Sequence, residues 1–243
     1  MHVLITRPEP DAGRLAGHLE ALGYAITLAP LMNIRRTGTP PDLAGVQAVA
    51  FTSANGVRAF AALTPSRGLP VFAVGAATAD AAHACGFTNV EVAGGDVDSL
   101  AALIAARADP AAGAVFHAAG SHVAGDLAQA LSGAGIEVRR QVLYEAQAAA
   151  RLPDAAVRAL RGAPRPLDGV LFYSPRSARL FEELTATAGL RARLAPLTAW
   201  CLSPSVAQEL TAALWRRIMV SPAPDQTSLL ALLPRPDGRP APQ

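Results

Sequence analysis

Short apolar runs alternate with longer amphipathic stretches along almost the whole chain. Runs such as 47–52 and 114–118 have the length and composition of buried strands. The stretches between them show the spacing of helices that bury one face, so the pattern predicts an α/β fold with parallel sheets. Strands are expected at 2–6, 24–29, 47–52, 70–74, 88–92, 114–118, 136–140, 169–173, 197–202 and 217–220. Helices are expected at 10–22, 55–64, 76–85, 98–107, 122–133, 154–161, 176–187, 204–214 and 226–233.

The chain contains an internal repeat. The segment that starts at Val3 matches the segment that starts at Val115, and each is predicted to form a strand, a loop, a helix and a second strand. At a constant offset of 112, the matched pairs are Val3 with Val115, Leu15 with Leu127, Leu19 with Leu131, Gly23 with Gly135 and Ile26 with Val138. The two glycines close their helices, where a left-handed conformation is expected.

A second unit also recurs. The segment 51–63 resembles 172–184, with Ser53 over Ser174, and both are followed by further matching blocks in the same order. Two similar domains follow, either in tandem with a boundary near 112 or with one domain inserted into the other. Polar, Pro-bearing stretches at 35–42 and 146–153 are the best linker candidates and favour the insertion. We therefore expect residues 1–36 with 149–243 as one domain and 37–148 as the other, with a disordered tail from residue 234.

Composition excludes several classes of function. The chain is 51% hydrophobic and 16% charged, and each of its 21 basic residues is Arg. Without Lys there is no Schiff-base or phosphate-loop lysine, and no Arg-rich stripe with aromatic partners suggests nucleic acid as a partner. Cys85 and Cys201 are expected as buried, reduced thiols rather than a disulfide. The start of the chain has no signal-peptide pattern and no segment suits a membrane, so a cytoplasmic protein is expected.

Candidate ligand-binding residues follow the predicted strands. In parallel sheets, ligands bind at the carboxyl ends of strands, where helix N-termini offer backbone donors. Arg7 could fork onto a carboxylate there, although a solvated surface Arg is the alternative. The hydroxyl residues could equally be ordinary helix caps. Two lobes with such loops would enclose a cleft suited to a polyacidic ligand. The candidate binding residues are Arg7, Ser53, Ala54, Gly120, Ser121, His122, Ser174, Pro175 and Ser205.

Candidate proton donors are few. Tyr144 is predicted on a strand just before the second linker, where a phenol could donate a proton; a half-buried packing residue is the alternative. His117 and His122 lie near only one carboxylate, Asp126, so a metal site is not expected. Neither a Ser-His-Asp order nor a Cys-His pair is evident.

Several segments together resemble the uroporphyrinogen-III synthase family. They include LITRPEP at the start, FTSANGVRAF, AVGAATADAA, the G-x-H-x-x-G-D-L loop, LYEA, FYSPRSARLF and the closing SLLALL, and they reach to about residue 233. The resemblance implies two similar flavodoxin-like α/β domains joined by a two-stranded linker. It also implies the dehydrative cyclisation of hydroxymethylbilane to uroporphyrinogen III, with inversion of ring D through a spiro intermediate. The resemblance further implies that no metal or cofactor takes part.

The resemblance also implies site residues. The family's proposed acid matches Tyr144, and the Thr of its Gly-x-x-Thr-Ala segment matches Thr78. The duplicate of that Thr is Val206 in this chain, with Ser205 beside it. A monomer is expected, with hydroxymethylbilane as substrate and a transient contact with hydroxymethylbilane synthase. The main alternative is a non-enzymatic two-lobed binding or sensor protein for an anionic small molecule, and a flavodoxin-like redox protein is a third reading.

Overall fold

Two compact units make up the fold. A computed structural model describes residues 1–122 and 125–236. Unit 1 comprises Met1–Asn33 with Gln147–Gln243, and unit 2 comprises Ile34–Ala146. The divisions therefore fall at 33/34 and 146/147, whereas the sequence suggested 36/37 and 148/149. The tail predicted to be disordered lies outside the described residues from 237 onward.

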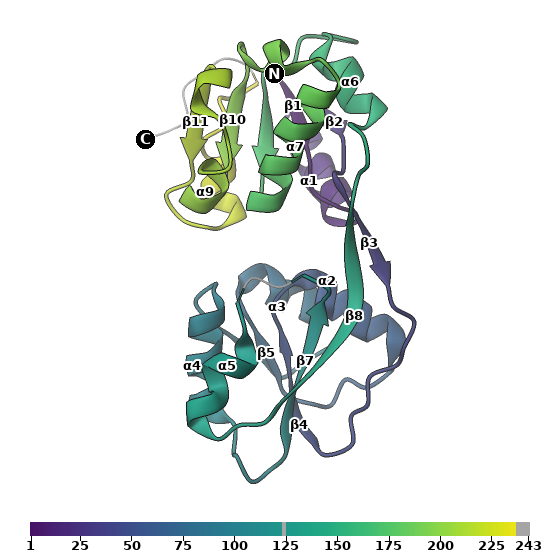
Figure 1. The fold of residues 1–243 in the computed structure, drawn as a ribbon, viewed down its shortest axis with the longest axis vertical. Helices are drawn as coiled ribbons and strands as arrows, with labels where there is room; N and C mark the ends of the chain where they lie inside the picture. The colour runs from purple at the N-terminus through teal and green to yellow at the C-terminus, as the bar shows by residue number, and fades with distance from the viewer. Residues whose placement is uncertain (123–124, 237–243) are drawn as a thin grey trace. The chain divides into compact units, whose positions relative to one another are not determined.

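Unit 1 is a parallel α/β unit with helices on both faces of its sheet (Figure 1). The strand order is β11-β10-β9-β1-β2. One face of the sheet packs against α6 and α7, and the other packs against α1 and α9. The strands are β1 (His2–Ile5), β2 (Ala25–Leu28), β9 (Gly169–Phe172), β10 (Thr198–Cys201) and β11 (Arg217–Val220). The helices are α1 (Asp11–Ala21), α6 (Asp154–Leu160), α7 (Pro175–Thr187), α8 (Pro204–Ala207) and α9 (Gln226–Leu230), with 3-10 turns η2 (Arg191–Leu194) and η3 (Ala212–Leu214).

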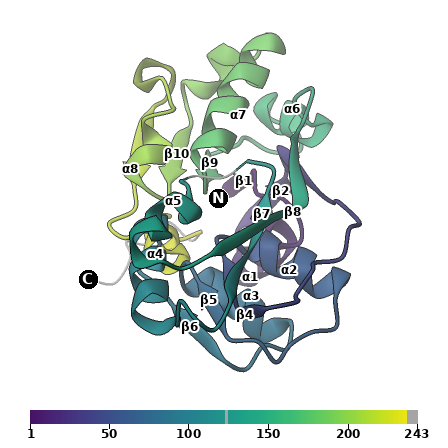
Figure 2. The same ribbon diagram turned by 60° about the horizontal axis from the view of Figure 1, so that its bottom comes forward.

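Unit 2 has the same architecture. Its strand order is β3-β8-β7-β4-β5-β6. Helices α2 and α3 cover one face, and α4 and α5 cover the opposite face, as Figure 2 shows. The strands are β3 (Met32–Arg36), β4 (Val46–Phe51), β5 (Val71–Ala73), β6 (Val90–Val92), β7 (Ala114–Gly120) and β8 (Val138–Ala148). The helices are α2 (Ala54–Leu63), α3 (Ala76–Ala84), α4 (Val97–Arg107) and α5 (Leu127–Leu131), followed by the 3-10 turn η1 (Ser132–Ala134).

The structure reproduces the sequence repeat at the level of strand register. Val3 pairs with Ile26 between β1 and β2, and Val115 pairs with Val138 between β7 and β8. These are the residues that match at the offset of 112. The order β11-β10-β9-β1-β2 in unit 1 corresponds to β6-β5-β4-β7-β8 in unit 2. The two glycines after the repeated helices both have positive φ, 90° at Gly23 and 69° at Gly135, as the sequence predicted.

Paired strands form the linkers, as the two-stranded linker implied by the family resemblance predicts. Strand β3 enters the linker candidate at 35–42 and pairs with β8. The partner strand β8 was predicted at 136–140 only, whereas it continues to Ala148. The backbone amides of Thr37 and Ala149 donate to Leu143 and Leu31 at 3.0 and 2.9 Å. The chain therefore passes between its units along paired strands (Figure 1).

Three predicted helices are shorter than expected: the one at 226–233 ends at Leu230 in α9, and the other two are shortened more. The stretch 122–133 was expected to be helical, but α5 spans only Leu127–Leu131, after Gly125 with φ 91°. Residues 123 and 124 lie outside the described part. The stretch 204–214 was also expected to be helical, but α8 ends at Ala207. The Glu182 carboxylate accepts the backbone N–H of Thr211 at 2.9 Å, which replaces a helical hydrogen bond there.

The thiols differ in exposure. Cys201 is buried in the core of unit 1 and Cys85 is half-buried in unit 2, and both are free. Within the described residues, none of the helices has the length and apolar character needed to cross a membrane.

Candidate functional site

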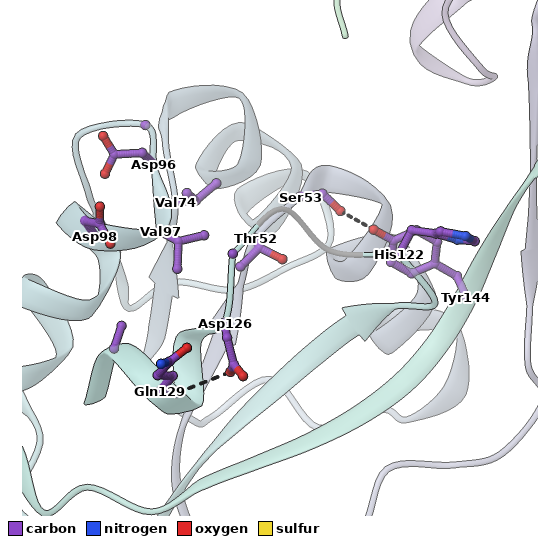
Figure 3. A pocket seen from close by; sticks show the side chains of 13 residues that line it. Thr52, Ser53, Val74, Asp96, Val97, Asp98, His122, Asp126, Gln129 and Tyr144 are labelled. Carbon is purple, nitrogen blue, oxygen red and sulfur yellow. Dashed lines mark hydrogen bonds between the residues drawn. The ribbon is translucent and has the colours of Figure 1, made fainter. Parts of the chain in front are cut away.

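A pocket of about 710 Å³ lies at the carboxyl ends of the strands in unit 2. Its walls come from the loops that follow β4, β5, β6 and β7, together with the middle of β8 (Figure 3). The lining residues are Thr52, Ser53, Val74, Gly95, Asp96, Val97, Asp98, His122, Gly125, Asp126, Gln129, Ala130 and Tyr144. Parallel α/β sheets bind their ligands at this edge.

A β-bulge directs Tyr144 toward this pocket. Strands β7 and β8 pair in a regular register up to Ala119 with Val142, and Gly120 then pairs with Tyr144. One residue of β8 is therefore extra at this point, which turns the side chain that follows it. A Cβ on Gly120 would lie 2.7 Å from Cζ of Tyr144 and 2.9 Å from its hydroxyl oxygen. The tyrosine ring thus occupies the space that the missing side chain leaves.

The phenol of Tyr144 is hydrogen-bonded to Ser53. Its Oη lies 2.8 Å from Ser53 Oγ, as Figure 3 shows. Tyr144 is only 8% exposed, and burial raises the pKa of its phenol above the usual range. The hydrogen bond from Ser53 and the positive charge of Arg58 act in the opposite direction on that pKa. The phenol of Tyr144 is therefore neutral at physiological pH.

A hydroxyl–imidazole pair lies next to the pocket. His117, on β7, is 2% exposed, and its Nε2 lies 3.2 Å from Oγ1 of the pocket residue Thr52. Burial, with a smaller contribution from the nearby charge of Arg140, lowers the pKa of His117 to about 4, while Asp126 opposes the shift. The imidazole is therefore neutral near pH 7. The sequence placed His117 beside a loop and gave no sign of this pair.

Three carboxylates line the pocket. Asp96 caps α4 by accepting the amide of Ser99 at 2.8 Å, which holds the pKa of Asp96 below its usual range. Asp126 caps α5 by accepting two amides, and Asp98 is exposed in the first turn of α4. In Figure 3, Asp96 and Asp98 lie on the side of the pocket away from Ser53 and Tyr144. Within residues 1–122 and 125–236, no group of three or more His, Cys, Asp or Glu side chains could hold a metal ion.

Sequence reasoning missed Asp96 and Asp98. The signal was present, because an acidic residue followed three positions later by Ser, just before an apolar run, is an N-cap pattern at a strand-end loop.

The structure brings together several of the predicted residues in unit 2. Ser53 and His122 line the pocket with Tyr144, and the backbone amide of Ser121 donates to the carbonyl of Tyr144 at 3.0 Å. Ala54 is the first residue of α2, directly after Ser53. Thr78 is different: it is 5% exposed in the first turn of α3 and is not among the lining residues.

Arg7 lies in unit 1 and is already engaged. Its guanidinium lies 4.3 Å from the centre of the Tyr173 ring, pairs with Asp11 at 3.3 Å and donates to Gln226 at 3.1 Å. Burial raises the pKa of Tyr173 to about 12, although the charge of Arg7 works against that shift. The sequence suggested Arg7 as a carboxylate ligand but did not suggest its stacking on Tyr173.

The remaining candidates in unit 1 serve as helix-start residues. Ser174 caps α7 by accepting the amide of Ser177 at 3.2 Å, and Pro175 is the first residue of that helix. Ser205 is exposed on α8, with its hydroxyl 2.9 Å from that of Ser203. Val206, beside it, is buried in the core. Local capping therefore accounts for the observed contacts of Ser174.

The comparisons with known proteins agree with this architecture. Residues 13–231 match the model of the family described as uroporphyrinogen-III synthase HemD. The chain belongs to this family. No match was found among curated proteins.

Two solved uroporphyrinogen-III synthase structures show the same fold at low identity. The enzyme of Helicobacter pylori is 17% identical, with a TM-score of 0.62, over 95% of this chain and 97% of that chain. A mutant enzyme of Thermus thermophilus is 18% identical, with a TM-score of 0.52, over 90% of this chain and 92% of that chain. At these identities the likeness establishes the two-domain parallel α/β fold of the HemD family and leaves activity as a separate question.

Proposed function

We propose that this protein is a uroporphyrinogen-III synthase, which converts hydroxymethylbilane to uroporphyrinogen III. The observation that carries the proposal is the Tyr144 phenol, held by Ser53 at the strand-end pocket of a HemD-family chain. The reaction removes one water and closes the ring with inversion of ring D. It involves no change of oxidation state, so acid catalysis and positioning are the tasks left to the protein.

Tyr144 supplies the proton in this proposal. The terminal hydroxyl of hydroxymethylbilane takes the phenolic proton and departs as water, which leaves a cationic azafulvene on the substrate. Ring D then attacks through its substituted carbon to form the spiro intermediate. After rearrangement, the ring-closing carbon loses a proton, which restores the phenol. Burial raises the pKa of this phenol, so the phenol carries its proton when the substrate binds.

The charges of the pocket suggest how the substrate is oriented. Asp96, Asp98 and Asp126 would repel acid side chains but would stabilise the cationic azafulvene. We therefore place the hydroxymethyl end of the substrate in this pocket. The acid side chains are left to Arg residues and to backbone donors, including the start of α3, which no side chain caps.

The product isomer tests the proposal directly. Protein is mixed with freshly prepared hydroxymethylbilane, the products are oxidised to porphyrins, and the type I and type III isomers are separated by chromatography. The proposal requires the type III isomer, at a rate that scales with protein concentration. Type I product alone, formed at the rate seen without protein, would return the chain to the binding-protein alternative.

A tyrosine pair separates the role of Tyr144 from general effects. Tyr144→Phe is expected to lower turnover about 10-fold or more, because it removes the proton donor and keeps the ring. Tyr24→Phe is the matched control, since the Tyr24 hydroxyl donates to the carbonyl of Pro234 in unit 1. It should leave turnover unchanged. Loss of folding in Tyr144→Phe, detected by circular dichroism, would assign this tyrosine to packing.

A further inference from the structure

Three groups form a hydrogen-bonded chain that ends at the Tyr144 phenol. The backbone N–H of Gly56 donates to Ser53 Oγ at 3.1 Å, and Ser53 Oγ lies 2.8 Å from Tyr144 Oη. Ser53 is the N-cap of α2, with an extended backbone at φ −164°. The side chain therefore contacts both the positive end of a helix and the phenol.

Close packing on both sides fixes the positions of these hydrogen-bonded groups. A Cβ on Gly56 would lie 2.7 Å from the carbonyl oxygen of Ala118, so α2 lies directly against β7 at the turn that Ser53 caps. A Cβ on Gly120 would collide with the Tyr144 ring. Because Gly56 and Gly120 have no side chains, the N-cap Ser53 of α2 and the ring of Tyr144 on β8 approach within hydrogen-bond distance.

The number of hydroxyl protons shared by Ser53 and Tyr144 determines what Ser53 does during the reaction. In the resting pair either hydroxyl can donate to the other. Once the phenolic proton has moved to the leaving hydroxyl, the phenolate oxygen has only lone pairs to offer. Ser53 must then donate its single proton to that oxygen, while its own oxygen continues to accept from Gly56.

We propose that Ser53 is a positioning residue for Tyr144: it aims the phenol at the pocket and stabilises the phenolate through the N-terminus of α2. This inference rests on the proposed role of Tyr144 as the acid. Ser53 was expected as a direct substrate ligand, and the new assignment gives it a role through the tyrosine. A charge-assisted hydrogen bond backed by a helix N-terminus is the kind of donor that stabilises a developing oxyanion.

One nearby charge acts on the phenol in the same direction as Ser53. Arg58, from α2, favours the phenolate, as does the hydrogen bond from Ser53, whereas burial opposes it. His122, in the loop after β7, lines the same pocket, and Arg140, on β8, donates to the carbonyl of Gly120. Ser53 differs from these groups because its hydroxyl contacts the phenol oxygen.

The acidity of Tyr144 can be measured without any substrate. The sequence has three tyrosines, Tyr24, Tyr144 and Tyr173. A protein labelled with ¹³Cζ-tyrosine therefore gives three resonances, which Tyr→Phe variants assign. Ser53→Ala is expected to raise the pKa of Tyr144 above its wild-type value and to leave the pKa values of the other two tyrosines unchanged. Ser53→Thr, which keeps a hydroxyl, should restore the wild-type value.

Ser174→Ala is the matched control for this titration. Ser174 caps α7 in unit 1 in the same way as Ser53 caps α2, but it belongs to the other unit. Its removal should cost a similar amount of stability and should not change the titration of Tyr144. A Tyr144 pKa that is unchanged in Ser53→Ala would overturn the proposal, whatever the activity assay shows.

Kinetics provides an independent test. Ser53→Ala is expected to lower kcat about 10-fold with little change in KM, as loss of one hydrogen bond to a charged group predicts. In a Tyr144→Phe background the same substitution should have almost no further effect on kcat. An equal loss in both backgrounds would overturn the proposal. If the wild-type protein forms only the type I isomer, the proposed function fails, while the tyrosine titration still decides whether Ser53 controls the phenol.

Discussion

The buried imidazole of His117 makes the stability of unit 2 depend on pH. In the folded protein its pKa is lowered to about 4 from the ordinary value of 6.5. The unfolded chain therefore takes up a proton that the folded chain refuses as the pH falls below about 6.5. Because the unfolded state binds more protons in this range, the free energy of unfolding decreases as the pH falls. The stabilising contribution is fully present above the unfolded pKa and is lost toward pH 4.

The size of the effect follows from the two pKa values. A shift from 6.5 to about 4 corresponds to a loss of about 2 kcal/mol by pH 5 and about 3 kcal/mol below pH 4. His117 is 2% exposed, so solvent does little to reduce this effect. Carboxylates also titrate in this range, and a variant is needed to isolate the contribution of the imidazole.

The comparison is between wild type and His117→Asn. Both tryptophans, Trp200 and Trp215, lie in unit 1, so their fluorescence does not monitor the unit that contains His117. Amide hydrogen exchange in β4 and β7, corrected for the intrinsic dependence of exchange on pH, reports the opening of unit 2 instead. Between pH 8 and pH 5 the wild type should lose about 2 kcal/mol more than the variant.

The outcome also has a direct spectroscopic check. The imidazole resonance of His117 should not titrate until the pH approaches 4. A midpoint near 6.5, or the same pH dependence of exchange in wild type and variant, would refute the reasoning. Either result would mean that the imidazole is hydrated or paired in its protonated form.

Three other substitutions test how the packing supports the site and the two units. Gly120→Ala should displace the Tyr144 ring and lower the rate of type III formation about 10-fold. Gly17→Ala is the control, because a Cβ there meets nothing within 4 Å, and it should leave that rate unchanged. Arg67→Ala should destabilise unit 2 by about 2–4 kcal/mol, because its guanidinium donates to four backbone carbonyls at the C-terminal ends of α2 and α3 and in the loop after α2. The measurement is amide exchange in α2 and α3, and equal exchange in variant and wild type would contradict this prediction. Glu182→Ala should destabilise unit 1 by about 2–4 kcal/mol, because it leaves an indole N–H and a backbone amide unpaired. Urea unfolding followed by tryptophan fluorescence measures this change. Glu182→Gln keeps the accepting oxygen and should lose less stability.

Much of the fold could be predicted because its signals are local. Apolar runs mark strands that are buried on both faces, and Ser or Asp before an amphipathic stretch marks the start of a helix. The repeat at an offset of 112 then predicted matched units, and the register of Val3 with Ile26 and of Val115 with Val138 agrees with it. Membership of the HemD family, suggested by the dispersed motifs, is confirmed by the family match.

The linkers and short helices could not be predicted in this way. Strand β3 has a largely exposed, polar pattern, so only its pairing with β8 identifies it as a strand. Helix α8 ends early because the carboxylate of Glu182, distant in sequence, takes an amide from the segment that follows. In both cases a partner from elsewhere in the chain decides the structure, and a local pattern contains no information about that partner.

The amino-acid sequence by itself determined the alternation of elements, the duplication and the set of residues at the strand ends. The tertiary structure alone decided which of those residues meet. Tyr144 reaches Ser53 because a bulge shifts the pairing of β7 and β8, and because Gly120 leaves room for the ring. His117 becomes a neutral imidazole because the sheet and its helices bury it. Register and burial are properties of strands brought together from distant parts of the chain, so they arise only when the whole unit is folded.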